Sequence, residues 1–194
     1  ANNVSKIDGQ SMLNGDLGFG VEIYGSTLTN PSNGNWKKSN NNAKYLITEN
    51  LAINTGLDID PGVVLTFEPS TKLTILKDGY LSAVGSNNAP VTFTGSVTSS
   101  PSWNGIEFKS DDVRNEMTFC EVSYGGANSI SGFSKTNILI RDLSYSGQSD
   151  NARLSIQNCI ISNSGGCGVY KDTNATLIQS GNTFTNNPLG SICN

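Results

Sequence analysis

Four lines of the chain can be aligned with one another, and this repetition constrains the fold more than any other feature of the sequence. The lines read MTFCEVSYGG from Met117, ILIRDLSYSG from Ile138, IQNCIISNSG from Ile156 and SGNTFTNNPL from Ser180. They begin about 21, 18 and 24 residues apart, a period typical of solenoids in which each repeat makes one turn. A unit this short cannot bury its own apolar face, so it needs similar units above and below it.

Short stretches upstream of these lines alternate apolar and polar residues, as β-strands with one buried face do. Asn, Gly, Pro and Asp stand between the stretches, where tight corners need them. Alignment of successive rounds places Leu51 over Leu73, Leu57 over Leu81 and Thr66 over Thr92, and yields three short strands per turn. The pattern predicts an all-β fold, a right-handed parallel β-helix of about six or seven coils.

The first part of the chain lacks this regularity. Residues 21–24 alternate like a strand, but residues 30–42 are polar and rich in turn formers. A solenoid exposes open backbone edges at its first coil, where an atypical cap is expected. We therefore expect residues 1–43 to form an N-terminal cap and loop, or the stub of a preceding domain, and residues 44–194 to form the β-helix.

Composition excludes several classes of function. Charged residues make up only 14% of the chain, the net charge is −4, and there is no histidine. Without histidine, the usual zinc ligand and every Ser-His or Cys-His nucleophile are ruled out. The lack of a long basic run makes nucleic acid a poor partner. No stretch approaches the roughly 20 apolar residues that a membrane span requires.

Four cysteines are present. The alignment puts Cys120 and Cys159 in one column but two coils apart, about 9.6 Å, which is too far for a disulfide. Cys167 and Cys193 are about one coil apart and can stack as neighbours. They form either a disulfide bridge or a pair of buried free thiols.

One resemblance is specific for the fold. Several motifs resemble those of a bacterial right-handed parallel β-helix family: Trp36, PGV at residues 61–63, GYLSAVG at residues 79–85, PVTFT at residues 90–94 and WNGI at residues 103–106. Members of that family are mostly secreted or attached to the cell surface, and many have no known activity. The resemblance covers residues 36–194 and implies the same location for this chain. It carries over no catalytic residue, because that family has no shared catalytic motif that can be placed on this chain. The histidine-bearing or arginine-bearing active-site motifs of the pectate lyases and polygalacturonases, which share the architecture, are missing here.

Glu121 and Asp142 occupy one column of the alignment. In adjacent coils they would lie about 5 Å apart, the separation at which glycoside-cleaving carboxylate pairs work. Arg141 and Arg153 are expected nearby. The simpler interpretation is a pair of solvated corner carboxylates whose repulsion Arg141 reduces. Calcium bound by this pair, or by the loop at Asp111-Asp112, is a weaker alternative because the ligand spacing of a calcium loop is missing.

Tyr124 and Tyr145 share another column. They would form either an aromatic strip on which sugar rings stack or an aromatic stack inside the coils, and the inward position of the neighbouring Val122 favours the inside. With Arg141 and Arg153, they are the candidate ligand-binding residues.

These features favour a non-catalytic function. We expect a secreted or cell-surface β-helix module that binds glycans or serves as a structural or adhesive element. One alternative is a polysaccharide hydrolase or lyase that uses Glu121 and Asp142. A second is an ice-binding β-solenoid, but the alignment leaves the Thr-x-Thr pairs at Thr92 and Thr183 out of register. The ligand and the oligomeric state stay open.

Overall fold

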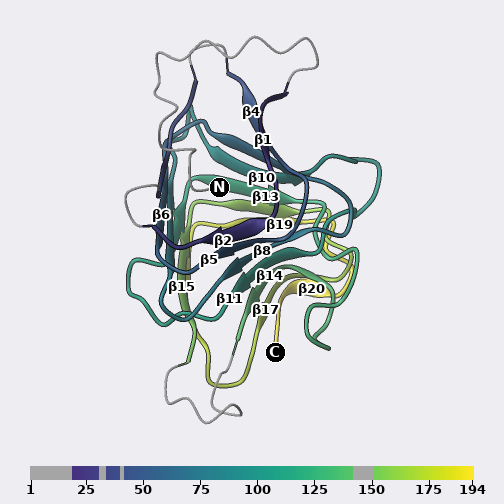
Figure 1. Ribbon diagram of the computed structural model, residues 1–194. Helices are drawn as coiled ribbons and strands as arrows, with labels where there is room; N and C mark the ends of the chain where they lie inside the picture. The colour runs from purple at the N-terminus through teal and green to yellow at the C-terminus, as the bar shows by residue number, and fades with distance from the viewer. Residues whose placement is uncertain (1–18, 31–33, 40–41, 142–150) are drawn as a thin grey trace.

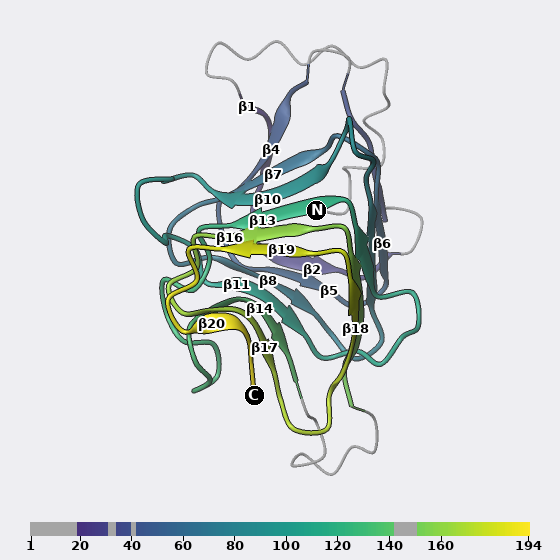
Figure 2. The same ribbon diagram turned by 180° about the vertical axis from the view of Figure 1, so that it is seen from behind.

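A computed structural model describes residues 19–30, 34–39, 42–141 and 151–194 (Figure 1). The chain winds through three parallel sheets, A, B and C, and each full coil adds one strand to each sheet. In order, sheet A contains β1 (Phe19–Ile23), β4 (Lys44–Ile47), β7 (Val64–Phe67), β10 (Val91–Gly95), β13 (Cys120–Ser123), β16 (Ile160–Ser162) and β19 (Thr183–Thr185). Figure 2, from behind, shows β7 to β19 following one another along this sheet.

The other two sheets have the same order along the chain. Sheet B contains β2 (Ser26–Leu28), β5 (Leu51–Ile53), β8 (Lys72–Ile75), β11 (Gly105–Phe108), β14 (Thr136–Ile140), β17 (Cys167–Lys171) and β20 (Gly190–Cys193). Sheet C contains β3 (Asn35–Trp36), β6 (Gly56–Ile59), β9 (Tyr80–Val84), β12 (Glu116–Thr118), β15 (Arg153–Gln157) and β18 (Thr176–Ser180). The prediction of a parallel β-helix with three strands per coil and six or seven coils is confirmed.

The core consists of columns of apolar side chains inside the three sheets. In sheet B one such column runs through five coils, and all its members are almost completely buried: Leu51, Leu73, Ile106, Ile138 and Val169. Each buried side chain of this size stabilises the fold by about 1.5–3 kcal/mol relative to leaving it in water. Phe67 and Trp103 add a stacked aromatic pair with ring centroids 4.2 Å apart.

The N-terminal segment takes part in the stack. The strand expected at residues 21–24 is present within β1, and β1, β2 and β3 extend all three sheets by pairing with β4, β5 and β6. The coil architecture therefore begins ahead of residue 44, where we placed the start of the β-helix. Backbone pairing explains the difference, because a short and largely polar strand still adds to a parallel ladder.

Two of the predicted alignments between coils are wrong. The line that starts at Ile138 lies in sheet B through β14, whereas the lines at Met117 and Ile156 lead into β13 and β16 of sheet A. Thr66 pairs with Thr94, two residues from the expected Thr92. A shift by two residues keeps every side chain on its own face, so alternation alone cannot detect it. The pairings of Leu51 with Leu73 and of Leu57 with Leu81 are as expected.

Candidate ligand-binding face

Glu121 lies on the outer face of sheet A. Its neighbours in the adjacent coils are Thr92 and Ile160. We expected Asp142 beside Glu121 in the next coil, but Ile160 occupies that position. The pairing of strands therefore gives no support to a catalytic pair of carboxylates. Asp142 itself lies outside the described residues. Arg141, which precedes it, follows β14 on sheet B and belongs to the same coil as Glu121.

Tyr124 follows β13 at a corner of the coil. Its backbone has a φ of 60°, in the left-handed region, and its partly buried ring packs against the core. The corresponding corners of the next two coils hold Asn163 and Asn186, also with positive φ. The interior interpretation fits Tyr124 better than a sugar-stacking strip does, while Tyr145 lies outside the described residues.

The backbone brings Arg141 close to the residue before Arg153. The amide of Ala152 donates to the carbonyl of Arg141 at 3.0 Å, and Arg153 opens β15 directly afterwards. The two arginines nevertheless belong to different sheets, because Arg141 directly follows β14 of sheet B and Arg153 begins β15 of sheet C.

The outer face of sheet B carries a cluster of charges that the sequence did not reveal. Glu107 is fully buried there, in the middle of β11. Its Oε2 accepts a hydrogen bond from Lys72 Nζ at 2.9 Å, and its Oε1 lies 3.0 Å from Arg141 Nη1 and 3.5 Å from Lys109 Nζ. We call these four residues the Glu107 cluster.

The Glu107 cluster holds one negative and three positive charges. Burial alone would raise the pKa of Glu107, but the hydrogen bond from Lys72 and the charges of Lys109, Lys72 and Arg141 outweigh it and lower that pKa. The carboxylate is therefore ionised, and two positive charges remain in excess. The three cationic side chains are 19–31% exposed, so the excess charge is accessible from solvent.

A loop covers one side of this cluster. Residues 127–135, the cover segment, fold over the outer face of sheet B. Ser131 Oγ lies 3.4 Å from Glu107 Oε1, and the guanidinium of Arg141 lies 4.5 Å from the centroid of the Phe133 ring. Phe133 also meets Tyr170 edge to face, and Leu139 beneath is fully buried. The cover segment fixes the arginine in place and removes Glu107 from water.

On the other side of the cluster the face is open and concave. The outward column of sheet B runs from Ala52 through Thr74 to Glu107, one coil per step. Ala52 lies in a groove of about 590 Å³. The groove is lined mainly by small and polar residues: Gly25, Ser26, Thr27, Glu49, Asn50, Ala52, Pro69, Ser70 and Thr71.

Lys72 connects the groove to the Glu107 cluster. Its amide donates to Asn50 Oδ1 at 3.0 Å at the edge of the groove, while its side chain reaches Glu107 in the next coil. Asn104 and Asn128 extend the polar rim, since Asn104 Nδ2 donates to the carbonyl of Ser70 at 2.7 Å and Asn128 Nδ2 donates to Asn104 Oδ1 at 3.1 Å. The groove, which begins at β2, and the cluster, which reaches Arg141 after β14, therefore form one continuous surface four strand spacings long, roughly 19 Å.

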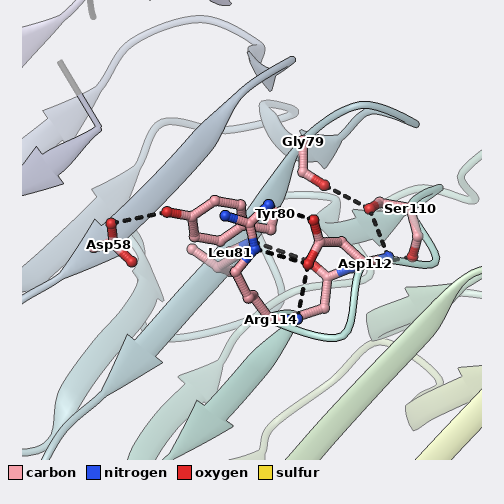
Figure 3. A network of polar contacts seen from close by, with 8 residues as sticks. Asp58, Gly79, Tyr80, Leu81, Ser110, Asp112 and Arg114 are labelled. Carbon is pink, nitrogen blue, oxygen red and sulfur yellow. Dashed lines mark hydrogen bonds and ion pairs between the residues drawn. The ribbon is translucent and has the colours of Figure 1, made fainter. Parts of the chain in front are cut away.

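Sheet C has a polar network of its own (Figure 3). Tyr80 donates to Asp58 Oδ2 at 3.1 Å, and Arg114 lies over the Tyr80 ring at 3.8 Å from its centroid. A Cβ on Gly56 would collide with the same ring, so the ring is covered by backbone on one side and by Arg114 on the other. It offers no free face to a sugar.

The Asp111-Asp112 loop belongs to this network. Both carboxylate oxygens of Asp112 contact Arg114, Oδ2 at 2.6 Å from Nη2 and Oδ1 at 2.9 Å from Nε. The hydrogen bond from Arg114 is the main reason that the pKa of Asp112 is lowered. In the part of the chain that the structure describes, no three Asp, Glu or Cys side chains come together as a metal site.

The cysteines form two pairs. Cys167 and Cys193 are joined by a disulfide between β17 and β20, with Cα atoms 6.1 Å apart. Cys120 and Cys159 are free and buried, and the prediction that two coils separate them is wrong. They lie in adjacent coils, where the amide of Cys120 donates to Cys159 Sγ at 3.3 Å. The line at Ile138 that seemed to intervene belongs to another sheet.

Hydroxyl side chains form a column on the outer face of sheet A: Thr66, Thr94, Ser123, Ser162 and Thr185. The sequence alignment left the Thr-x-Thr pairs at Thr92 and Thr183 out of register, but their second members, Thr94 and Thr185, belong to this one column. The neighbouring column is mixed, because Glu121 and Ile160 follow Thr92. The regular array is therefore one residue wide, which is less than a two-column ice-binding face offers.

Sequence reasoning found Arg141 but missed its partners. Glu107 stands between Ile106 and Phe108 in a strand, with Lys109 two residues later on the same face. This Glu-x-Lys spacing, which puts both charges on one face of a strand, is the local pattern that could have indicated an ion pair. Lys72 and Arg141 come from the preceding and following coils, so only the correct register brings them to Glu107.

Comparison with known proteins adds no further assignment. No protein-family model, curated protein or solved structure was found to match the chain. Among the described residues, no helix is long and apolar enough to cross a membrane.

Proposed function

We propose that this β-helix is a secreted or cell-surface module that binds acidic polysaccharide without cleaving it. The surface formed by the groove and the Glu107 cluster is the proposed binding face. The observation that carries the proposal is the excess of two positive charges held at a fixed position on an otherwise acidic chain of net charge −4.

The chemistry of the face fits a chain of sugar rings that bear carboxylate or sulfate groups. Lys72 and Lys109 can donate to an anionic group while Glu107 holds their side chains in place. Ser26, Asn50 and Ser70 in the groove offer hydroxyl, amide and carbonyl groups to sugar hydroxyls. Because a solenoid surface is extended and rigid, it can contact several consecutive sugars without reordering.

Two observations support the proposed location. The Cys167–Cys193 disulfide is of the kind that persists in oxidising compartments. The motifs at residues 79–85 and 90–94 resemble those of the bacterial surface β-helix family, and we include membership of that group in the proposal. An adhesive role at a cell surface would follow from binding the glycans of that surface.

Binding to soluble polysaccharides tests the proposal. The chain should bind polygalacturonate or heparin and should leave neutral dextran unbound, and the affinity should fall as salt is raised. Lys72→Gln and Lys109→Gln should each weaken binding about tenfold, the loss expected for one charge-assisted hydrogen bond of about 1.5 kcal/mol.

Lys44→Gln is the matched control, because it removes the same charge from an exposed position on sheet A. Unfolding temperatures of all variants show whether a loss of binding reflects a loss of fold. Equal binding of neutral and acidic polymers, or full binding by the Lys72→Gln/Lys109→Gln double variant, would refute the proposed face. The appearance of unsaturated or reducing ends would show an enzyme instead.

A further inference from the structure

Two free thiols lie inside the coils, on the core-facing side of sheet A. Cys120 begins β13 and Cys159 directly precedes β16, and each is only 1% exposed. Glu121 pairs in register with Ile160, so the residues before them, Cys120 and Cys159, are direct neighbours on parallel strands. The proposed binding face lies on sheet B and makes no use of this pair.

The spacing of the two cysteines suits a covalent bond between them. Neighbouring strands of a sheet lie about 4.8 Å apart, and the Cα atoms of a disulfide are roughly 4.4–6.8 Å apart. The amide nitrogen of Cys120 lies 3.3 Å from the Sγ of Cys159. The disulfide between Cys167 and Cys193 already joins two neighbouring coils of this chain. A second such bond fits the existing distance between β13 and β16.

The two sulfur atoms have different surroundings. Cys120 Sγ lies 3.2 Å from the carbonyl oxygen of Ala83, and burial raises the pKa of this thiol. At Cys159, a hydrogen bond from the Cys120 thiol and another from the Cys120 amide outweigh burial and lower the pKa. The thiolate is the reactive form of cysteine. Cys159 is therefore the better nucleophile of the pair, and Cys120 keeps its proton.

A small cavity adjoins the pair. Its volume is about 70 Å³, and its lining includes Cys120 and Asn158, the residue before Cys159. One water molecule requires about 10–15 Å³ of such space. The cavity can thus admit a molecule of a few atoms, such as hydrogen peroxide, but it is too small for a peptide disulfide such as oxidised glutathione.

From this geometry we propose that Cys120 and Cys159 are an oxidation site at which hydrogen peroxide forms a second disulfide between neighbouring coils. Cys159 Sγ attacks one peroxide oxygen, the O–O bond breaks, and the departing hydroxide takes the thiol proton of Cys159 and leaves as water. Cys159 is then a sulfenic acid. Cys120 Sγ attacks the sulfur of this group, the S–O bond breaks, and the hydroxide leaves as a second water with the proton of Cys120. One peroxide is reduced and two thiols are oxidised.

Thiol counting and peptide mapping of the intact, folded chain test the proposal. Peroxide should lower the number of free thiols from two to none, and the map should show Cys120 linked to Cys159 within one chain. Oxidised glutathione should leave both thiols intact in the folded chain but react with them after unfolding in urea. The Cys167→Ala/Cys193→Ala variant should form the same new linkage, because the two pairs lie on different sheets.

Single variants test the roles of the two sulfur atoms. Cys120→Ser should still form a sulfenic acid at Cys159, which dimedone traps. In Cys159→Ser the remaining thiol should react with peroxide at least about tenfold more slowly, because a buried, protonated thiol is a poor nucleophile. Circular dichroism shows whether each variant is folded.

Three results would overturn the proposal, and two of them need only the wild type. They are folded wild type that keeps both thiols in peroxide, wild-type oxidation that links two chains instead of Cys120 to Cys159, or Cys159→Ser that reacts as fast as Cys120→Ser.

Discussion

Replacing Glu107 with glutamine should destabilise the protein by about 3 kcal/mol at pH 7. The substitution preserves the shape of the side chain but leaves Lys72, Lys109 and Arg141 around a neutral amide. Removal of one partner from a buried ion pair costs roughly 3–5 kcal/mol. The lower end applies here because the three cations are 19–31% exposed and can regain water.

The loss should depend on pH in a defined direction. The pKa of Glu107 lies below its ordinary value of 4.5, because the cations outweigh the effect of burial. A carboxyl group with a lowered pKa in the folded state stabilises that state above the unfolded pKa, and the contribution disappears as the pH falls through the folded pKa. The difference in unfolding free energy between wild type and Glu107→Gln should therefore have its full size at pH 7 and shrink progressively below pH 4.5.

Urea denaturation of both proteins at pH 7 and at pH 3 measures this difference. Glu121→Gln is the control, since it neutralises a partly exposed carboxylate on sheet A and should change the unfolding free energy by less than about 0.5 kcal/mol. The reasoning is refuted if Glu107→Gln is as stable as wild type at pH 7, or if its deficit is the same at both pH values.

Three further predictions concern the fold. The double substitution Cys167→Ala/Cys193→Ala should lower the unfolding free energy measured in urea by about 3.5 kcal/mol, the value for two cysteines 26 residues apart. Reductant should have the same effect on wild type but none on the variant. Burial, with the charge of Asp60 adding to it, raises the pKa of Tyr45 to about 12, so the neutral phenol stabilises the folded state. The unfolding free energy of wild type should therefore fall by about 2–3 kcal/mol between pH 10 and pH 12, and an equal fall in Tyr45→Phe would contradict this. Asn163 has a φ of 52° and accepts a hydrogen bond from Asn186 at 3.0 Å, so Asn163→Ala should lower the unfolding free energy by about 1–2 kcal/mol. The thermal midpoint should fall accordingly, and an unchanged midpoint would count against this reasoning.

The alternation of apolar and polar residues was enough to predict the strands and the winding of the chain. Leu51 and Leu73, and likewise Leu57 and Leu81, occupy matching positions in rounds of similar length, so their pairing was readable. The repeat also identified Cys167 and Cys193 as neighbours one coil apart. These features depend on local pattern and on a nearly constant period.

The register between coils of unequal length was harder to predict. The line at Ile138 has the same in-and-out pattern as the line at Met117, but it lies on a different sheet. The alternation of apolar and polar residues indicates on which face of a strand a side chain lies, but it does not indicate to which sheet the strand belongs. The Glu107 cluster depends on that missing information, because Lys72 and Arg141 reach it from separate coils.

The Glu107 cluster also has a mechanical consequence. Each coil of a solenoid touches only the coils next to it, so under tension coils can peel away singly from either end. Glu107 binds Lys72 in the coil before it and Arg141 in the coil after it, which fastens three successive coils together on one side. A molecule stretched from its two ends in an optical trap should release its outer coils in short steps and these three in one longer step.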